Sequence, residues 1–240
     1  MKYNWFAKVY DELMDDTLYP EWAAYTGQHL TGQDHILELG CGTGILATEL
    51  TKAGFDITGL DLSSDMLSLA YDRQIDTGIR YPLVEMDMKD FSELGKFDGI
   101  LCYSDALCYI QSEEEKKQIF QEVYNQLTEE GTFLFDVHSI YQIEQFKQFS
   151  YHDEVNQIVF LWDSFEGEQD YSIEHQLTFF VENENKMYER FEEVHREWTH
   201  PLETYIDLLK SVGFKSVEVT ADFGETVSDT SKRWFFAVKK

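Results

Sequence analysis

Short apolar runs alternate with amphipathic stretches over residues 34–137. Consecutive apolar residues predict buried strands, whereas apolar residues that recur every three or four positions predict helices. The expected strands are 35–39, 56–60, 80–86, 97–103 and 132–137, and the expected helices are 45–53, 64–73 and 113–127. Repeated strand–helix units of this size predict an α/β fold in which helices cover both faces of a parallel sheet.

The pattern changes after His138. Residues 139–150 have the spacing of a helix, and the stretches 155–162 and 172–181 have the composition of strands with no helix between them. Residues 187–198 fit either a helical stripe or a strand, and their strand-like neighbours favour a strand. Successive strands predict a small antiparallel sheet. We therefore expect residues 139–200 to form an inserted subdomain within a main domain of residues 1–138 and 201–240.

The C-terminal segment returns to the first pattern. Residues 201–212 are expected to form a helix that Pro201 opens and Gly213 ends. Two further strands are expected at 216–221 and 233–238, and the acidic loop 222–231 between them permits a hairpin. With these two strands, the predicted main sheet has seven strands and is mostly parallel.

Three glycines at alternate positions follow the first predicted strand. The segment 36–47 has the sequence Ile-Leu-Glu-Leu-Gly-Cys-Gly-Thr-Gly-Ile-Leu-Ala. Glycines at a strand-to-helix turn let a ligand approach the backbone and the helix N-terminus closely, although many turns need glycine for steric reasons alone. The dinucleotide fingerprint requires a further glycine where Ile45 stands, and a Walker loop requires a lysine that this segment lacks.

The spacing Glu38-x-Gly40-x-Gly42-x-Gly44 resembles the first motif of class I S-adenosylmethionine-dependent methyltransferases. The resemblance covers residues 34–137 and, more weakly, 213–238, while the insertion loosely resembles the β-lids of some small-molecule members. It implies a Rossmann-like fold, S-adenosylmethionine as the cofactor, S-adenosylhomocysteine as its product, and methyl transfer as the activity. It also implies that the loop, including Cys41, packs against the methionine part of the cofactor while Glu38 helps to organise the site.

Asp61 closes the second predicted strand, in the order typical of that family. The resemblance implies that this carboxylate holds both ribose hydroxyls, since its two oxygens match two vicinal donors. Leu62 and Met66 are implied to flank the adenine. Considered alone, Asp61 is equally compatible with a cap on the following helix, and Leu62 and Met66 are compatible with ordinary core positions.

Further candidates follow the next two strands. After the third strand, Asp87 is implied to accept from the adenine amino group, while Met88 offers a backbone N–H and an apolar contact. After the fourth strand, Tyr103 and Ser104 are implied to line the methyl-transfer end. Features at the carboxyl ends of four successive strands indicate a single crevice, which is where open α/β sheets bind ligands.

A sulfonium methyl group is already activated, so methyl transfer requires neither a metal nor a covalent enzyme intermediate. The protein is expected to position the reactants and exclude water. An amine, oxygen or acidic carbon acceptor can require a general base. His138, at the end of the fifth strand, is the best-placed candidate and belongs to the residue type that titrates near neutral pH. Asp136, His195 and His200 are the other candidates, and a structural hydrogen-bonding role is the alternative for a histidine.

Aromatic residues are concentrated in two places. The resemblance implies that the N-terminal segment folds over the cofactor with Tyr10 near the sulfonium, where a cation–π contact is favourable. An amphipathic helix that covers the sheet explains the same N-terminal residues. In the insertion, aromatic residues are expected to form either an acceptor pocket or a small core of their own. They are Phe160, Trp162, Phe179, Phe180, Tyr188 and Trp198.

The chain of 240 residues has 46 acidic and 19 basic side chains, which give it a formal charge of −27. Such a surface repels phosphate backbones and anionic lipids. A small-molecule acceptor is therefore favoured, and neither a nucleic acid nor a membrane partner is expected. Two alternatives stay open: a methyltransferase acting on tRNA or protein, and a cofactor-binding module without turnover. The sequence indicates no particular oligomeric state.

Cys41, Cys102 and Cys108 form an odd, sparse set without the paired spacing of zinc ligands. Small buried thiols in a reducing compartment are expected, with no bound metal. The N-terminus lacks the apolar core of a signal peptide, and no apolar run approaches the roughly 18 residues that span a bilayer. These features predict a cytoplasmic protein.

Overall fold

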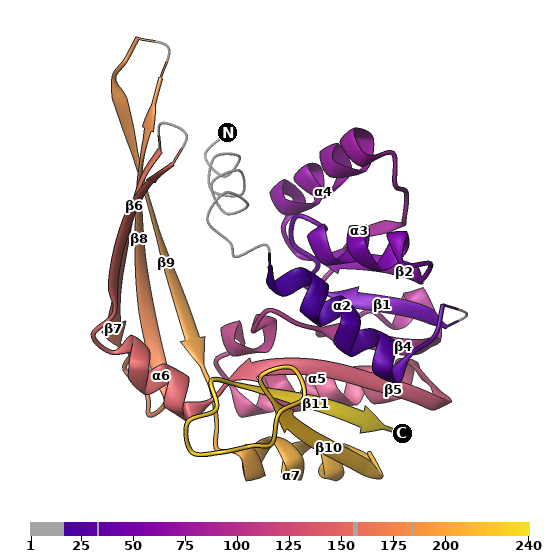
Figure 1. The fold of residues 1–240 in the computed structure, drawn as a ribbon. Helices are drawn as coiled ribbons and strands as arrows, with labels where there is room; N and C mark the ends of the chain where they lie inside the picture. Colours follow the sequence, from indigo (N-terminus) through magenta and orange to yellow (C-terminus); the bar gives the residue numbers. More distant parts are fainter. Residues whose placement is uncertain (1–16, 33, 156–157, 184) are drawn as a thin grey trace.

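A computed structural model of the chain describes residues 17–32, 34–155, 158–183 and 185–240. Two sheets organise this part of the chain (Figure 1), one of seven strands in the order β10-β11-β5-β4-β1-β2-β3 and one of four in the order β6-β7-β8-β9. The strands of the larger sheet are β1 (His35–Leu39), β2 (Asp56–Asp61), β3 (Leu83–Glu85), β4 (Phe97–Cys102), β5 (Leu127–His138), β10 (Ser216–Ala221) and β11 (Arg233–Lys239).

The predicted mostly parallel sheet of seven strands is confirmed. Strands β1 to β5 pair in parallel, whereas β11 is antiparallel to both β5 and β10. The chain runs outward from β1 to β2 and β3 on one side, and through β4 and β5 on the other. The reversal between β1 and β4 opens a crevice at the carboxyl ends of the strands, which is the usual ligand site of such sheets.

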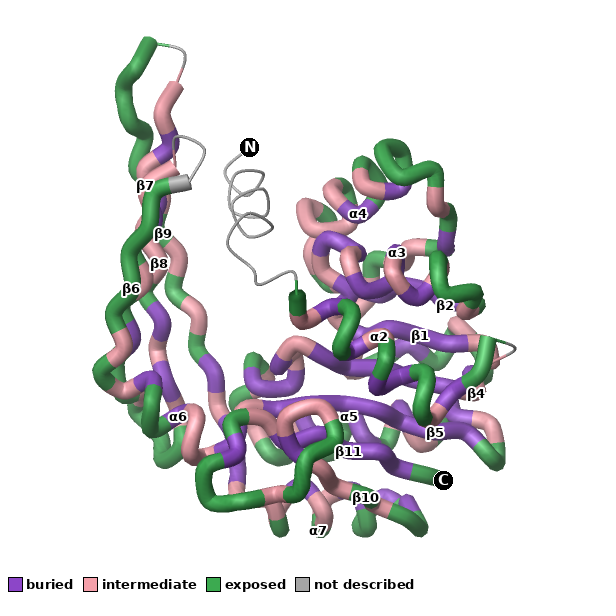
Figure 2. Tube along the Cα trace, in the orientation of Figure 1, coloured by how far each residue is buried: buried purple, intermediate pink, exposed green. Residues whose placement is uncertain are grey.

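Apolar side chains alternate between the two faces of this sheet. On β5, Phe133 and Phe135 pack on one face with residues of α5 (Glu113–Gln126) and α7 (Leu202–Val212), whereas Leu134 packs on the other face with residues of α2 (Leu18–His29) and α3 (Ile45–Lys52). Strands buried on both sides are expected of a parallel sheet between helices, and Figure 2 shows the central strands β1, β4 and β5 as mostly buried. The helices are α2 (Leu18–His29), α3 (Ile45–Lys52), α4 (Ser64–Thr77), α5 (Glu113–Gln126), α6 (Ile140–Phe146) and α7 (Leu202–Val212), with short 3₁₀ turns η1 (Ser92–Leu94) and η2 (Ala106–Tyr109).

The four-stranded sheet is antiparallel and stands beside the main body, with α6 at its base (Figure 1). Its strands are β6 (Ser150–Val155), β7 (Ile158–Glu166), β8 (Ser172–Glu182) and β9 (Tyr188–Trp198). Residues 188–198 are thus a strand, as predicted. On the inner face Phe160 pairs with Phe179, which pairs in turn with Phe191. On the outer face Leu161 and Val194 are exposed.

The strand predicted for residues 155–162 is present as β7 with shifted bounds, and the strand before it was not predicted. One strand, β6, ends at Val155, and a second, β7, begins at Ile158 and pairs with it antiparallel. Residues 139–150 contain a shorter helix than predicted, because α6 ends at Phe146. The sequence of β6 is polar because it is an edge strand of the smaller sheet, so it lacks the apolar pattern that identifies a buried strand.

No helix in the described ranges is long and apolar enough to cross a membrane.

Candidate active site

The loop after β1 turns sharply at its three glycines. Gly40, Gly42 and Gly44 have φ angles of +69°, +52° and +72°, a region that favours glycine. A Cβ atom at Gly44 would lie 2.3 Å from the Tyr81 hydroxyl, so this glycine is required for packing. A Cβ atom at Gly42 would meet nothing within 4 Å. The middle of the loop therefore faces open space, into which a side chain would protrude.

Asp61, the last residue of β2, holds the glycine loop in place. One carboxylate oxygen accepts a hydrogen bond from the Gly42 backbone N–H and the other accepts one from the Ser63 N–H, both at 2.8 Å. Ser63 in turn caps α4, since its hydroxyl accepts from the Met66 N–H. Each Asp61 oxygen retains a further lone pair for a ligand donor. Burial raises the pKa of this carboxyl, and the backbone N–H groups of Ser63, Gly42 and Leu62 oppose that rise.

Glu38 lies buried on β1 behind the loop. Its Oε2 atom has no hydrogen-bond partner among the described residues. Burial, together with the charge of Asp61, raises the pKa of Glu38 to about 8. A buried carboxyl oxygen without a donor is costly, and a ligand N–H or O–H at this point would satisfy it.

The other residues predicted to bind the cofactor lie around the same strand ends. Leu62 is 68% exposed, which is unusual for a leucine beside a buried strand. Met66 lies in the first turn of α4, and Met88 packs against the main core. Asp87 accepts a hydrogen bond from the Lys89 N–H at 2.9 Å and retains a half-exposed side chain. Tyr10 lies outside the described residues.

Tyr103 does not line a cavity with its side chain, contrary to expectation. Its ring is buried in the core cluster that includes Tyr25 and Phe235, and its hydroxyl lies 3.2 Å from the Thr26 hydroxyl. The reason is strand alternation, because Tyr103 shares the face of Leu101, which belongs to the same cluster. Any ligand contact of Tyr103 would be through its main chain.

Ser104 and Asp105 follow β4 in a strained turn that does face a cavity. Their φ angles are +55° and +58°, and two successive non-glycine residues in this region cost about 1–3 kcal/mol each. Both residues line a cavity of about 470 Å³ between the main sheet and the inner face of the smaller sheet. Aromatic and apolar side chains line it together with polar and charged ones, a combination found in small-molecule sites.

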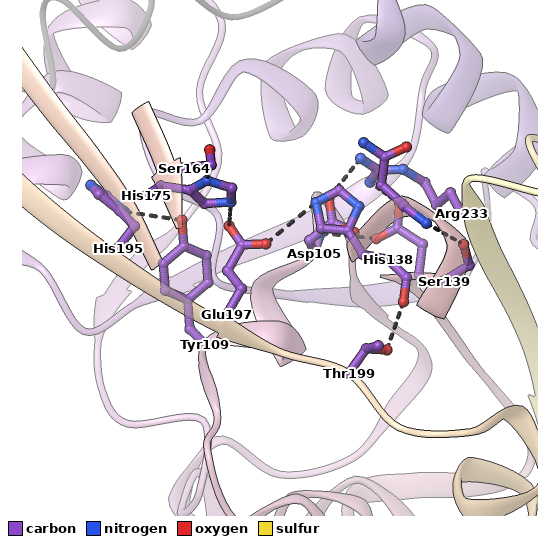
Figure 3. Close-up of polar contacts among 12 residues, drawn as sticks. Asp105, Tyr109, His138, Ser139, Ser164, His175, His195, Glu197, Thr199 and Arg233 are labelled. Atoms are coloured by element: carbon purple, nitrogen blue, oxygen red, sulfur yellow. Dashed lines mark hydrogen bonds and ion pairs between the residues drawn. The ribbon is translucent and has the colours of Figure 1, made fainter. Parts of the chain in front are cut away.

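A buried ion network anchors the polar end of this cavity (Figure 3). The Arg233 guanidinium lies 2.6 Å from Asp136 and 2.6 Å from Asp105. Asp136 also accepts from the Trp22 indole N–H at 2.8 Å and from the Asp105 backbone N–H at 3.1 Å. Asp136 is fully buried and does not line the cavity, so its place in the structure is that of an anchor and not of a general base.

His138 lines the cavity and lies between two carboxyl groups (Figure 3). Its Nε2 atom is 3.2 Å from Asp105 Oδ2 and 3.4 Å from Glu197 Oε2. Burial, reinforced by the charge of Arg233, lowers the pKa of His138 to about 3. The ring is therefore neutral at neutral pH and a weak base. Nδ1 of His138 is buried and has no hydrogen-bond partner among the described residues.

The two remaining histidine candidates differ in position. His195 lines the cavity, with its Nδ1 atom 3.1 Å from the Tyr109 hydroxyl. His200 is buried against Trp198 and Tyr205 and does not line the cavity. Of the candidate general bases, only His138 and His195 line this cavity.

The aromatic residues of the insertion divide by strand alternation. Phe160, Trp162 and Phe179 line the cavity. Phe180 and Tyr188 do not, because their register positions lie on the opposite face of the sheet. Trp198 is also directed away, and its ring packs against His200 in a tilted arrangement. Half of the predicted aromatic set thus lines the cavity.

Four residues at the polar end are absent from the predicted site: Asp105, His175, Glu197 and Arg233. Two of them could have been predicted from the alternation of side chains along a strand, since Glu197 lies on the same face as His195, and His175 lies on the same face as Phe179. Asp105 directly follows the predicted Ser104. Arg233 carries no local signal, because it reaches the site through the antiparallel pairing of β11 with β5 opposite His138.

The three cysteines are buried free thiols, as expected. Among the described residues, no group of three or more His, Cys, Asp or Glu side chains is arranged to hold a metal ion.

A family model described as a methyltransferase domain matches residues 36–131. Two curated proteins bear the name "Putative methyltransferase", one from Geobacillus sp. (strain WCH70) and one, YqeM, from Bacillus subtilis (strain 168). Both are 37% identical to this chain over its full length, and the matches cover 100% and 98% of the two relatives.

Solved structures show the same architecture. An S-adenosylmethionine-dependent methyltransferase from Clostridium acetobutylicum is 27% identical, with a TM-score of 0.84 over 99% of this chain and 98% of that one. The sugar N-methyltransferase KedS8 from Streptoalloteichus sp. shares the fold at 18% identity, with a TM-score of 0.77 over 98% of this chain and 93% of that one.

Proposed function

We propose, from the premise that this chain belongs to the class I S-adenosylmethionine-dependent methyltransferases, that it methylates a small molecule held in the cavity beside Ser104 and His138. S-adenosylmethionine is its cofactor. The observation that carries the proposal is the cavity of about 470 Å³, which lies at the carboxyl end of β4 and β5 and is lined on its far side by the smaller sheet. Its volume suits a metabolite, not a polymer.

The residues of the glycine loop fit the methionine part of the cofactor. We assign this part to Gly40, Cys41, Gly42 and Gly44, with Glu38 behind them. The open space over Gly42 supports the assignment, and so does the unpaired Oε2 atom of Glu38, which is an acceptor for a ligand donor.

The nucleoside part fits the next strand ends. We assign the ribose hydroxyls to Asp61 and the adenine to Leu62, Met66, Asp87 and Met88. The exposed apolar side chain of Leu62 supports this assignment, since a bound aromatic ring would cover it. Ser104 marks the methyl-transfer end, where the nucleoside site would meet the cavity.

When bound, the cofactor supplies an activated methyl group, and the reaction is a direct in-line displacement by the acceptor. The chain's own contribution is to position the acceptor and exclude water. The aromatic side chains Phe160, Trp162 and Phe179 supply an apolar wall. His138 belongs to the proposed catalytic set as the neighbour of Asp105 and Glu197, because a pKa near 3 makes it a poor proton acceptor by itself.

The inserted residues 139–200 are proposed as the lid that completes the acceptor site. Phe146, His175 and Glu197 come from this segment and line the cavity together with residues of the main sheet. Two structural neighbours support a small-molecule acceptor, since one is named a sugar N-methyltransferase and another an amino pentose methyltransferase.

The proposal predicts where a labelled methyl group will be found. Wild-type protein is incubated with methyl-labelled S-adenosylmethionine and with small-molecule, RNA and protein fractions of a cell extract, each tested separately. We expect the label in the small-molecule fraction. The Asp61→Ala variant, which lacks the proposed ribose partner, is the blank. Label confined to RNA or protein would refute the acceptor class, and cofactor binding without transfer to any fraction would indicate a binding module.

A further inference from the structure

We propose that the acceptor carries an amino group, which binds in its ammonium form beside the Glu197 carboxylate while the remainder of the acceptor lies against Phe146, Phe160 and Phe179. This inference rests on the function proposed above, because it names the acceptor class for the same cavity. It is based on the charge, the unpaired acceptors and the aromatic side chains of the cavity.

Acidic groups outnumber cations at the buried end of the cavity. Asp105, Asp136 and Glu197 meet there, and Arg233 is the cation that pairs with the first two. Among the described residues, the ion pairs of Glu197 are with His138 and His175 alone, at 3.4 and 3.9 Å. Lys232 and Asp222 also line the cavity, but Lys232 is exposed at the surface. One buried carboxylate is thus without a cationic partner.

The neighbouring histidines do not supply the missing charge. Burial lowers the pKa of both His138 and His175 to about 3, so both rings are neutral at neutral pH. Burial, together with the charge of Asp105, raises the pKa of Glu197 to about 8. A cation bound beside Glu197 would favour its ionised form, so a bound ammonium and this carboxylate would stabilise each other.

The unsatisfied polar atoms at this end call for hydrogen-bond donors. Glu197 Oε2 and Asp105 Oδ1 are buried and accept no hydrogen bond from the described residues. Both side chains are more than nine-tenths buried and line the cavity. An ammonium group has up to three N–H donors, whereas a hydroxyl has one and a carboxylate has none. An anionic acceptor would in addition be repelled by the two carboxyl groups.

Aromatic side chains line the same cavity. Phe160 and Phe179 stack with ring centroids 5.0 Å apart, and Phe146 lies 4.9 Å from His175 by the same measure. Aromatic faces attract alkylammonium groups and also cover apolar carbon. The cavity therefore matches an amine on a largely apolar skeleton or on the carbon face of a ring.

In the proposed methyl transfer, Glu197 is the proton acceptor. An N–H proton of the ammonium passes to the carboxylate, which frees the nitrogen lone pair. The lone pair forms the N–C bond to the methyl carbon while the C–S bond breaks and its electron pair stays on sulfur. The positive charge moves from sulfur to nitrogen, and the product is an N-methylammonium ion with a neutral thioether.

Matched pairs of an amine and the alcohol of the same skeleton test the proposal. We choose 2-phenylethylamine with 2-phenylethanol, cyclohexylmethylamine with cyclohexylmethanol, and glucosamine with glucose, each titrated calorimetrically into wild-type protein loaded with S-adenosylhomocysteine. In at least one pair the amine should bind ten times more tightly than the alcohol. Equal binding within every pair, the absence of binding by all amines, or a preference for alcohols would overturn the proposal.

The Glu197→Gln variant should reduce the preference for the amine at least threefold, because the amide retains the size of the side chain but not its charge. Glu192→Gln, at an exposed position on the same strand, should leave the preference unchanged. An undiminished preference in Glu197→Gln would contradict the assignment of this carboxylate. The wild-type comparison stands by itself if the variant misfolds. The same titrations without S-adenosylhomocysteine separate the two proposals, since failure of cofactor binding would leave amine selectivity measurable.

Discussion

Replacing Arg233 with methionine is expected to lower the free energy of unfolding by about 3 to 5 kcal/mol, the usual loss when one partner of a buried ion pair is removed. The substitution retains an unbranched side chain but leaves Asp105 and Asp136, both buried, without their cation. For a chain of this length the loss corresponds to a decrease in Tm of about 6 to 20 °C. Differential scanning calorimetry at neutral pH measures it directly.

The deficit should depend on pH in a defined direction. Burial already raises the pKa of Asp105 and Asp136 in the wild-type protein, and Arg233 opposes that rise. Without Arg233 the folded-state pKa values of the two carboxyl groups lie still further above their unfolded values. An acid whose folded pKa is raised is stabilising when protonated, so the variant loses stability as pH rises through its folded pKa. The loss in free energy of unfolding relative to the wild type should therefore be smallest in acid and increase toward neutral pH.

Lys232→Met is the matched control, because it removes the same charge from the adjacent, exposed position. Exposed substitutions usually change stability by no more than about 0.5 kcal/mol. Equal losses in the two variants, or a deficit for Arg233→Met that shrinks as pH rises, would contradict the account of the buried network.

The second large effect is expected on cofactor affinity. Asp61→Ala should weaken binding of S-adenosylmethionine by at least about 100-fold, because two charge-assisted hydrogen bonds of about 1.5–3 kcal/mol each are removed. The same substitution also frees the Gly42 N–H that now donates to Asp61, so the loop loses its support. Isothermal titration calorimetry with S-adenosylmethionine gives the dissociation constants.

Asp72→Ala serves as the control for this measurement, since Asp72 is an exposed carboxylate on α4, the helix that follows Asp61. Its affinity for the cofactor should equal that of the wild type. If Asp61→Ala also binds with wild-type affinity while remaining folded, the ribose assignment is wrong.

The α/β body was predictable because its signals are local. The buried strands contain short apolar runs, and both faces of β5 are covered, as the sequence of Phe133, Leu134 and Phe135 indicates. The glycine loop was also predictable, because positive φ angles at Gly40, Gly42 and Gly44 require that residue type. The edge strand β6 was not, because its polar sequence has no pattern distinguishable from a loop.

The cavity depends on contacts that no local pattern encodes. Trp22, Asp105, Asp136 and Arg233 come from four distant parts of the chain and meet only after the sheet has formed. The orientation of Tyr103 was within reach of prediction, because alternation along β4 places it on the buried face of Leu101. The order of strands, which brings Arg233 opposite His138, was beyond sequence patterns.

The central claim, that the loop of residues 40–44 holds the cofactor, is tested most directly by calorimetric titration of S-adenosylhomocysteine into three proteins. Gly42→Ala and Gly78→Ala both place a Cβ atom in open space at a positive φ, so both bear a similar backbone strain. Only Gly42 lies in the loop. We predict one site in the wild type, the same affinity in Gly78→Ala and at least tenfold weaker binding in Gly42→Ala. Equal affinity in all three proteins, or no binding to the folded wild type, would contradict the claim.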